Sequence, residues 1–137
     1  TEEEFERTLE CVRRARWDSG FLFKYSKRER TAAYSWDDQV PEEVKPERLA
    51  RLIALQEEIS LGLNRNAVGK VTDVLVEAVP GYDPEQEINV IKGRTRTNKS
   101  VAIAPPKDGF FPVVGATVRA RIVSCKPVTL TGELVQD

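Results

Sequence analysis

The sequence predicts an α+β fold, with helical segments in the first half of the chain and a small antiparallel β-barrel in the second. Apolar residues recur at helical spacing up to about residue 67, and with a period of two from Lys70 onward. Turn residues, mostly proline and glycine, separate the short apolar runs of the second half. With 137 residues, 40% of them hydrophobic, the chain can bury a core as one domain or as two small ones.

The N-terminal segment is predicted to be a helix followed by a short strand. The first four residues have the pattern of a capping box, and Phe5, Leu9 and Val12 form an apolar stripe at helical spacing. A turn at residues 18–20 ends the helix, and residues 21–26 are typical of an aromatic strand. A helix, a turn and a strand make only part of an αβ layer, so we expect further elements to complete it.

Polar residues at the end of this predicted strand are candidates for a binding site. In α/β sheets ligands gather just beyond the carboxyl ends of the strands. A basic loop that is merely solvated is the alternative interpretation. The candidate residues are Tyr25, Ser26, Arg28 and Thr31.

A linker with two prolines then leads into a long helix. Pro46 suits the first turn of a helix, one apolar face continues to about residue 67, and Gly69 closes the element. We interpret this helix as a brace between two modules. The alternative is a surface that binds a partner, although a single apolar stripe is fully used by packing within the chain.

Four or five short antiparallel strands are predicted after the long helix. Alternating or apolar runs, separated by turn residues, occupy residues 71–79, 94–103, 117–123 and 130–135. So many short strands in about 68 residues indicate a small closed barrel of the oligonucleotide-binding kind. Barrels of this kind bind single-stranded nucleic acid on a basic strand face.

The most distinctive polar pattern lies at the start of the 94–103 run. Long polar residues alternate there with threonine, so in a continuous strand Arg94, Arg96 and Asn98 would project from one face. Guanidinium groups offer rigid forks of donors that suit phosphates and base edges. A solvated edge strand whose charges prevent aggregation is the alternative. The predicted RNA-binding residues are Arg94, Arg96, Asn98, Lys99, Arg119 and Arg121.

Charge is distributed unevenly along the chain. The formal net charge is −1, yet residues 92–126 carry eight Lys and Arg residues against one Asp. An acidic run, Asp83, Glu85 and Glu87, comes just before them. Because salt limits the reach of each charge to about 8–10 Å, local concentration decides contact with a polyanion. Arginines scattered over opposite walls, or neutralised by nearby carboxylates, would contradict the binding role.

Several kinds of chemistry lack the residues that they need. Histidine is absent, and the two cysteines, Cys11 and Cys125, have neither metal-ligand spacing nor a disulfide framework, so we expect no catalytic or metal-binding residue and a cytoplasmic location. No run of about 18 apolar residues and no basic, apolar leader is present. Because the chain has no initiator methionine and begins on a helix cap, we expect a piece of a longer protein.

Four motifs, in register along the chain, carry a resemblance to a known family. They are Phe23-Lys24-Tyr25-Ser26-x-Arg28-x-x-Thr31-x-Ala33, Asp38-Gln39-Val40-Pro41-x-x-Val44-Lys45, Arg48-Leu49-x-x-Leu52-x-x-Leu55-Gln56 and Gly93-Arg94-Thr95-Arg96-Thr97-Asn98. Together they resemble the C-terminal part of the radical-SAM tRNA methylthiotransferases of the MiaB type. The chain departs from that family in the loop after Ser26, where relatives often have prolines and a glycine, so this loop can take a different path.

The resemblance implies three domains: the C-terminal end of a radical-SAM barrel (1–36), a linker with the long helix (37–68) and a TRAM β-barrel that contacts tRNA (69–137). The implied reaction adds a 2-methylthio group to N6-isopentenyladenosine beside the anticodon, and the implied partners are the tRNA anticodon stem-loop and the rest of the same polypeptide. Residues Tyr25, Ser26, Arg28 and Thr31 would line the rim of the active site.

The resemblance also implies 4Fe–4S clusters and S-adenosylmethionine for the full-length enzyme. The cluster-binding cysteine triplet of the family is missing here, so we expect this chain alone to bind neither cofactor and to be inactive. Two alternatives stay open: a free-standing RNA-binding or docking module without catalysis, and a relative acting on threonylcarbamoyl-adenosine.

Overall fold

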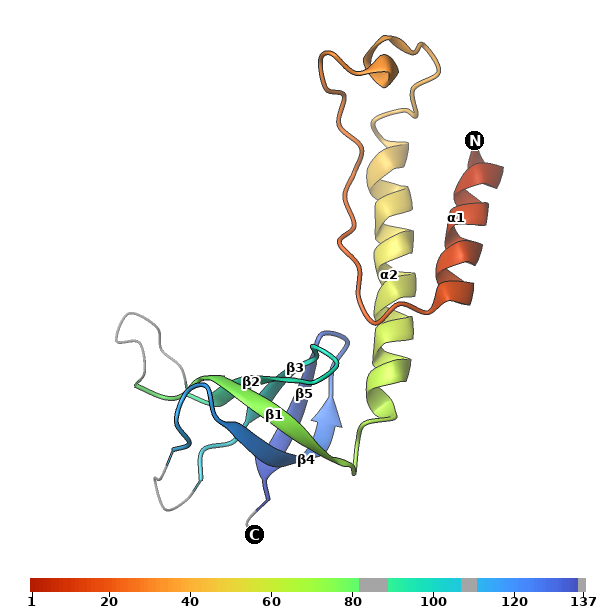
Figure 1. The fold of residues 1–137 in the computed structure, drawn as a ribbon. Coiled ribbons are helices and arrows are strands. Elements are labelled where there is room, and N and C mark those ends of the chain that lie inside the picture. Colours follow the sequence, from red (N-terminus) through yellow and green to blue (C-terminus); the bar gives the residue numbers. More distant parts are fainter. Residues whose placement is uncertain (82–88, 107–110, 136–137) are drawn as a thin grey trace. The chain divides into compact units, whose positions relative to one another are not determined.

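The computed structural model describes residues 1–81, 89–106 and 111–135, which form two compact units, Thr1–Ser60 and Leu61–Asp137 (Figure 1). The predicted acidic run at residues 83–87 lies outside the described residues. The elements are α1 (Glu2–Ala15), a short 3-10 helix (Ala32–Ser35), α2 (Val44–Arg65), β1 (Val71–Ala78), β2 (Ile91–Thr95), β3 (Ser100–Ile103), β4 (Thr117–Cys125) and β5 (Thr129–Leu134). No helix in the described part of the chain has the length and apolar character needed to cross a membrane.

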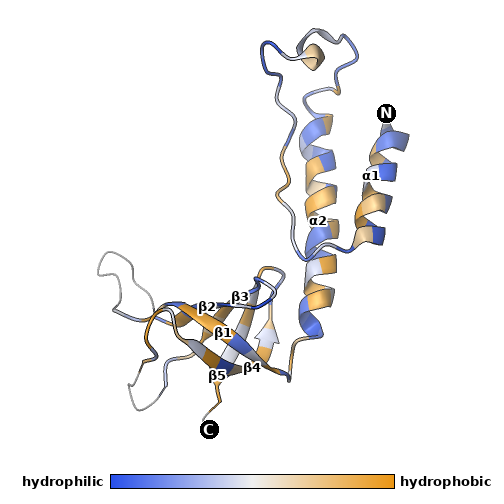
Figure 2. Cartoon of the chain, viewed as in Figure 1, coloured by the Kyte–Doolittle hydropathy of each residue, from blue (hydrophilic) through white to orange (hydrophobic). Residues whose placement is uncertain are grey.

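The predicted capping box and apolar stripe of α1 are both confirmed. The Thr1 hydroxyl accepts a hydrogen bond from the Glu4 backbone N–H at 3.2 Å, and the Glu4 carboxylate accepts one from the N-terminal amine of Thr1 at 2.7 Å. Leu9 and Val12 are buried. Both α1 and α2 contain hydrophilic and hydrophobic residues in turn along their length, as expected for helices that pack on one side (Figure 2).

Arginines of α2 hold α1 in place. The guanidinium carbon atoms of Arg48 and Arg51 lie 5.3 and 4.8 Å from the centre of the Phe5 ring, within the range of cation–π attraction. Both arginines also form ion pairs with Glu2, at 3.0 Å from Arg48 and 2.7 Å from Arg51. Hydrogen bonding from Arg51, supported by Arg48, lowers the pKa of Glu2 below its ordinary value.

The prediction of a strand at residues 21–26 is wrong. This segment has no regular secondary structure, and no described strand pairs with it. Its aromatic side chains stand in solvent, with Phe21 94% and Phe23 81% exposed. Strand propensity marks side chains that pack well on a sheet, and without a neighbouring strand the backbone cannot form the ladder that defines one.

The second unit is a closed barrel with the strand order β1-β2-β3-β5-β4. Four pairs of neighbours are antiparallel as predicted, but β3 and β5 are parallel, so the prediction of an antiparallel barrel is wrong for this pair. β4 comes between them in sequence and runs antiparallel to β5, which turns β5 into the direction of β3. The core consists of the inward side chains Val74, Val76, Ile91, Val101, Ile103, Ala120, Ile122 and Leu130.

The single strand predicted at residues 94–103 is in fact a hairpin, and that prediction is wrong. β2 ends at Thr95 and β3 begins at Ser100. Asn98 adopts a left-handed conformation with φ 62°, which asparagine tolerates better than most residues. The Thr95 hydroxyl accepts a hydrogen bond from the Lys99 backbone N–H at 3.1 Å, and the Thr95 carbonyl accepts one from the Asn98 N–H at 2.9 Å. These bonds stabilise the turn.

Candidate nucleic-acid interface

Three adjacent strands, β2, β1 and β4, present their outward side chains on one side of the barrel. The register sets Leu75 of β1 opposite Arg94 of β2 and Thr117 of β4, and sets Asp73 opposite Arg119. We call this surface the outer wall: the outward residues of these three strands together with the β2–β3 turn. It brings arginines from distant parts of the sequence onto one surface.

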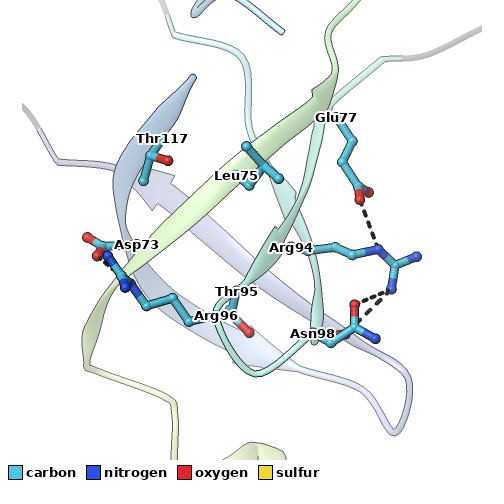
Figure 3. A pocket seen from close by; sticks show the side chains of 8 residues that line it. All are labelled: Asp73, Leu75, Glu77, Arg94, Thr95, Arg96, Asn98 and Thr117. Carbon is cyan, nitrogen blue, oxygen red and sulfur yellow. Dashed lines mark hydrogen bonds and ion pairs between the residues drawn. The ribbon is translucent and has the colours of Figure 1, made fainter. Parts of the chain in front are cut away.

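A shallow depression of about 370 Å³ lies on the outer wall (Figure 3). Leu75, 46% exposed, gives it an apolar patch between charged groups. Three predicted RNA-binding residues share this depression with residues that the sequence analysis did not select. The lining residues are Asp73, Leu75, Glu77, Arg94, Thr95, Arg96, Asn98 and Thr117.

Arg94 and Arg96 each bind a carboxylate of β1. Arg94 Nε donates to Glu77 Oε1 at 3.0 Å, and its Nη1 donates to Asn98 Oδ1 at 3.2 Å (Figure 3). Arg96 Nε donates to Asp73 Oδ2 at 3.1 Å. Sequence reasoning missed both carboxylates, although the alternation of β1 already placed Asp73 and Glu77 on its outward face.

This pairing is the arrangement that would weigh against a binding role for the two arginines. Each of these ion pairs adds little to the free energy of the free protein, because ion pairs between solvent-exposed groups contribute about 0–1 kcal/mol. The Arg96 side chain is 84% exposed, and the side chains of Arg94 and Glu77 are 46% and 44% exposed. Phosphate groups can therefore exchange with the carboxylates, and the binding role of these residues stays a prediction.

The remaining predicted RNA-binding residues lie in two different places. Arg119 and Arg121 are exposed on β4 and extend the outer wall, and Arg121 Nη1 donates to the carbonyl of Gly69 at 3.2 Å. Lys99 makes a different contact, since its Nζ donates to Asn64 Oδ1 at 2.9 Å. The structure thus brings Arg94, Arg96 and Asn98 together and gives Lys99 a bond to the end of α2.

Asn64 was not predicted, and it joins three segments of the second unit. It is 4% exposed, and its Nδ2 donates to the carbonyls of Lys126 at 2.9 Å and Pro127 at 3.0 Å. With the bond from Lys99, the amide links the last turn of α2 to the β2–β3 and β4–β5 turns. Buried amides are retained where every polar atom finds a partner, as here.

In the first unit, all four predicted rim residues come together. Tyr25, Ser26, Arg28 and Thr31 line one depression of about 310 Å³. The Thr31 hydroxyl donates to the Arg28 carbonyl at 2.7 Å, which tightens the loop. Lys45 lies 5.6 Å from the centre of the Tyr25 ring.

The donor set of this chain does not fit an iron–sulfur cluster. Such clusters are held mainly by three or four cysteine thiolates, whereas the chain has two cysteines. Cys11 lies on α1 in the first unit and Cys125 at the end of β4 in the second. Among the residues described, no three His, Cys, Asp or Glu side chains gather into a group that could hold a metal ion.

The fold and the outer wall define the class of the second unit, a small closed β-barrel of the oligonucleotide-binding type with arginines on its strand face. No family model matches the chain.

Individual relatives, however, match it over nearly all of its length. It is 45% identical over 135 residues to a tRNA-2-methylthio-N(6)-dimethylallyladenosine synthase of Carboxydothermus hydrogenoformans, covering 98% of this chain and 29% of the relative. Proteins with the same name from Alkaliphilus oremlandii and Caldicellulosiruptor saccharolyticus are 41% and 48% identical, covering 100% and 86% of this chain but 27% and 24% of theirs. The chain is therefore a homologue of the MiaB-type tRNA methylthiotransferases, as its motifs predicted, and spans less than a third of the length of these relatives.

Proposed function

We propose that this chain is the tRNA-contacting part of a methylthiotransferase that modifies adenosine beside the tRNA anticodon. The observation that carries the proposal is the 41–48% identity, over nearly the whole chain, to relatives named as synthases of 2-methylthio-N6-dimethylallyladenosine in tRNA. In this proposal residues 1–36 complete a radical-SAM barrel, residues 37–68 form the linker and long helix, and residues 69–137 are a TRAM domain. The iron–sulfur clusters and S-adenosylmethionine would be held by residues outside this chain.

The proposed RNA contact is the outer wall of the barrel. Arg94 lies on β2, Arg96 in the β2–β3 turn and Arg119 on β4, on the two sides of β1, where their guanidinium groups can contact phosphates of the anticodon stem. Phosphate contacts of this kind fix the position of an RNA without reading its sequence. The barrel would thus hold the stem, and the choice of base would lie elsewhere.

The depression of the first unit is the proposed rim of the active site. Tyr25 offers an aromatic face on which an unstacked base can lie, and Arg28 offers a guanidinium for a nearby phosphate. Ser26 and Thr31 add hydroxyl groups to the same depression. Their shared location supports this role.

A salt titration of RNA binding tests the proposal. The chain is mixed with a tRNA anticodon stem-loop, and the double variant Arg94→Ala with Arg96→Ala is compared with the unchanged chain. We expect weaker binding and a log–log salt slope that falls by roughly 0.7–0.9 for each phosphate that the variant no longer neutralises.

The matched control is Arg7→Ala with Arg13→Ala, which removes two exposed arginines that also form ion pairs, but on α1. We expect this control to keep the slope of the unchanged chain. If Arg94→Ala with Arg96→Ala leaves both affinity and slope as they are, the outer wall does not hold the RNA.

A further inference from the structure

Two carboxylates stand among the arginines of the outer wall, where a surface built only to attract phosphates would have none. Asp73 faces Arg119 across the β1–β4 ladder and accepts from Arg96, and Glu77 accepts from Arg94. Both carboxylates line the same depression as the arginines (Figure 3). Any polyanion that settles on this wall therefore meets two negative charges as well as the positive ones.

A phosphate that takes over Arg94 or Arg96 removes the hydrogen bond that this arginine gave to its carboxylate partner. An ionised carboxylate only accepts hydrogen bonds, so it repels phosphate oxygens and is stabilised only by a group that donates. The ribose 2′-hydroxyl is such a donor and lies next to every phosphate of an RNA strand. A DNA strand offers the same phosphates without that hydroxyl.

We propose that Asp73 and Glu77 are specificity-determining residues of the outer wall. Each holds one arginine in the free protein, and together they admit a polyanion that brings hydrogen-bond donors beside its phosphates, which selects RNA over DNA. This inference rests on the proposed function, because it concerns the surface that we assign to tRNA binding.

The experiment uses a matched pair of ligands, the anticodon stem-loop as RNA and the same sequence as DNA. Binding of both is measured over a range of salt concentrations for the unchanged chain and for the double variant Asp73→Asn with Glu77→Gln. Amides keep the size of the carboxylates but carry no charge and can donate to a phosphate. We expect DNA binding to strengthen about three- to thirtyfold, RNA binding to change less, and the RNA-to-DNA affinity ratio to fall.

The salt dependence supplies a second readout. In the unchanged chain each freed carboxylate takes up a cation, which cancels part of the counterion release from the nucleic acid. We expect the double variant to show a steeper slope for DNA, by up to about one unit for each carboxylate removed. The single variants Asp73→Asn and Glu77→Gln are expected to give part of each effect.

The control is the double variant Glu57→Gln with Glu58→Gln, which also removes two exposed negative charges, but from α2 and not from the outer wall. The inference is overturned if the RNA-to-DNA affinity ratio is unchanged in the double variant. It is also overturned if the ratio changes no more in the double variant than in this control. If Arg94→Ala with Arg96→Ala still weakens RNA binding in that case, the proposed function stands without it. If the unchanged chain does not bind the RNA stem-loop even at low salt, both fall.

Discussion

Gly93 shows how closely two strands of the barrel approach each other. It lies in β2 opposite Val76 of β1 with its inward side against the core. A Cβ atom at this position would come within 2.3 Å of the Leu75 carbonyl oxygen and 2.6 Å of a Val74 methyl group. Neither the backbone nor a buried valine can yield easily, because protein interiors are close-packed.

We therefore expect Gly93→Ala to destabilise the barrel by about 1–3 kcal/mol, the usual cost of overpacking a core. Urea denaturation followed by circular dichroism would show this as a lower midpoint. Gly132→Ala is the matched control, since this inward glycine of β5 has its nearest contact at 3.3 Å. A loss no greater for Gly93→Ala than for Gly132→Ala would mean that β1 and β2 can separate at little cost.

At the scale of single residues, the sequence identified the cations of the candidate site but not their partners. Arg94, Arg96 and Asn98 could be selected because polar residues alternate with threonine there. Their carboxylate partners lie 17 and 23 residues earlier in the chain, and only the register of β1 against β2 brings them together. Periodicity reports the face of a residue and carries no information on which strand lies beside it.

Among the elements, α1 has ion pairs to α2 in addition to its buried apolar residues Leu9 and Val12. Because Arg51 and Arg48 depress the pKa of Glu2 in the folded protein, this pairing contributes its full stability above the unfolded pKa of Glu. The contribution is lost as the pH falls through the depressed folded pKa. The first unit is thus expected to weaken in acid, below about pH 4.

Glu2→Gln removes this titrating group and should flatten the dependence of the first unit's unfolding temperature on pH in the acidic range. Thermal unfolding followed by the circular dichroism of the helices measures it. Glu3→Gln serves as the control, because Glu3 pairs with Arg7 inside α1. If the unfolding temperature of Glu2→Gln depends on acid pH as strongly as that of the unchanged chain, other carboxylates cause the dependence.

The prediction of an element was correct where local sequence determines the element. It was wrong where pairing with another strand determines it. The cap of α1, the helix that ends before Gly69 and the alternation of β1 follow from neighbouring residues alone. The split of residues 94–103 into a hairpin depends on the left-handed Asn98 and on the Thr95 hydroxyl, a turn without glycine that a continuous polar alternation conceals. The unpaired segment 21–26 shows the opposite case, strand composition with no strand beside it.

Considered as a whole molecule, the chain divides at Ser60 and Leu61, inside α2 and ahead of the predicted domain start at residue 69. Asn64 lies on the C-terminal side of this division, and its buried amide binds the β2–β3 and β4–β5 turns. The last turn of α2 therefore belongs to the barrel structurally.

Two shortened chains test this boundary. We expect residues 61–137 to fold into a barrel that unfolds cooperatively, and residues 69–137, which lack Asn64, to be about 1–3 kcal/mol less stable because the three hydrogen bonds of its amide are absent. Chemical denaturation compares them. Within residues 61–137, Asn64→Ala should reproduce most of the difference, and equal stability of all three would place the boundary at residue 69.

The closed strand order has one more consequence. Each of the five described strands has a neighbour on both sides, so within the described part of the barrel no strand is an open edge that a peptide or a second copy could extend. Whatever docks on the strand face of this barrel is recognised mainly through outward side chains. Exchanging the few residues that point outward could therefore redirect the barrel to a new ligand while its interior stays as it is.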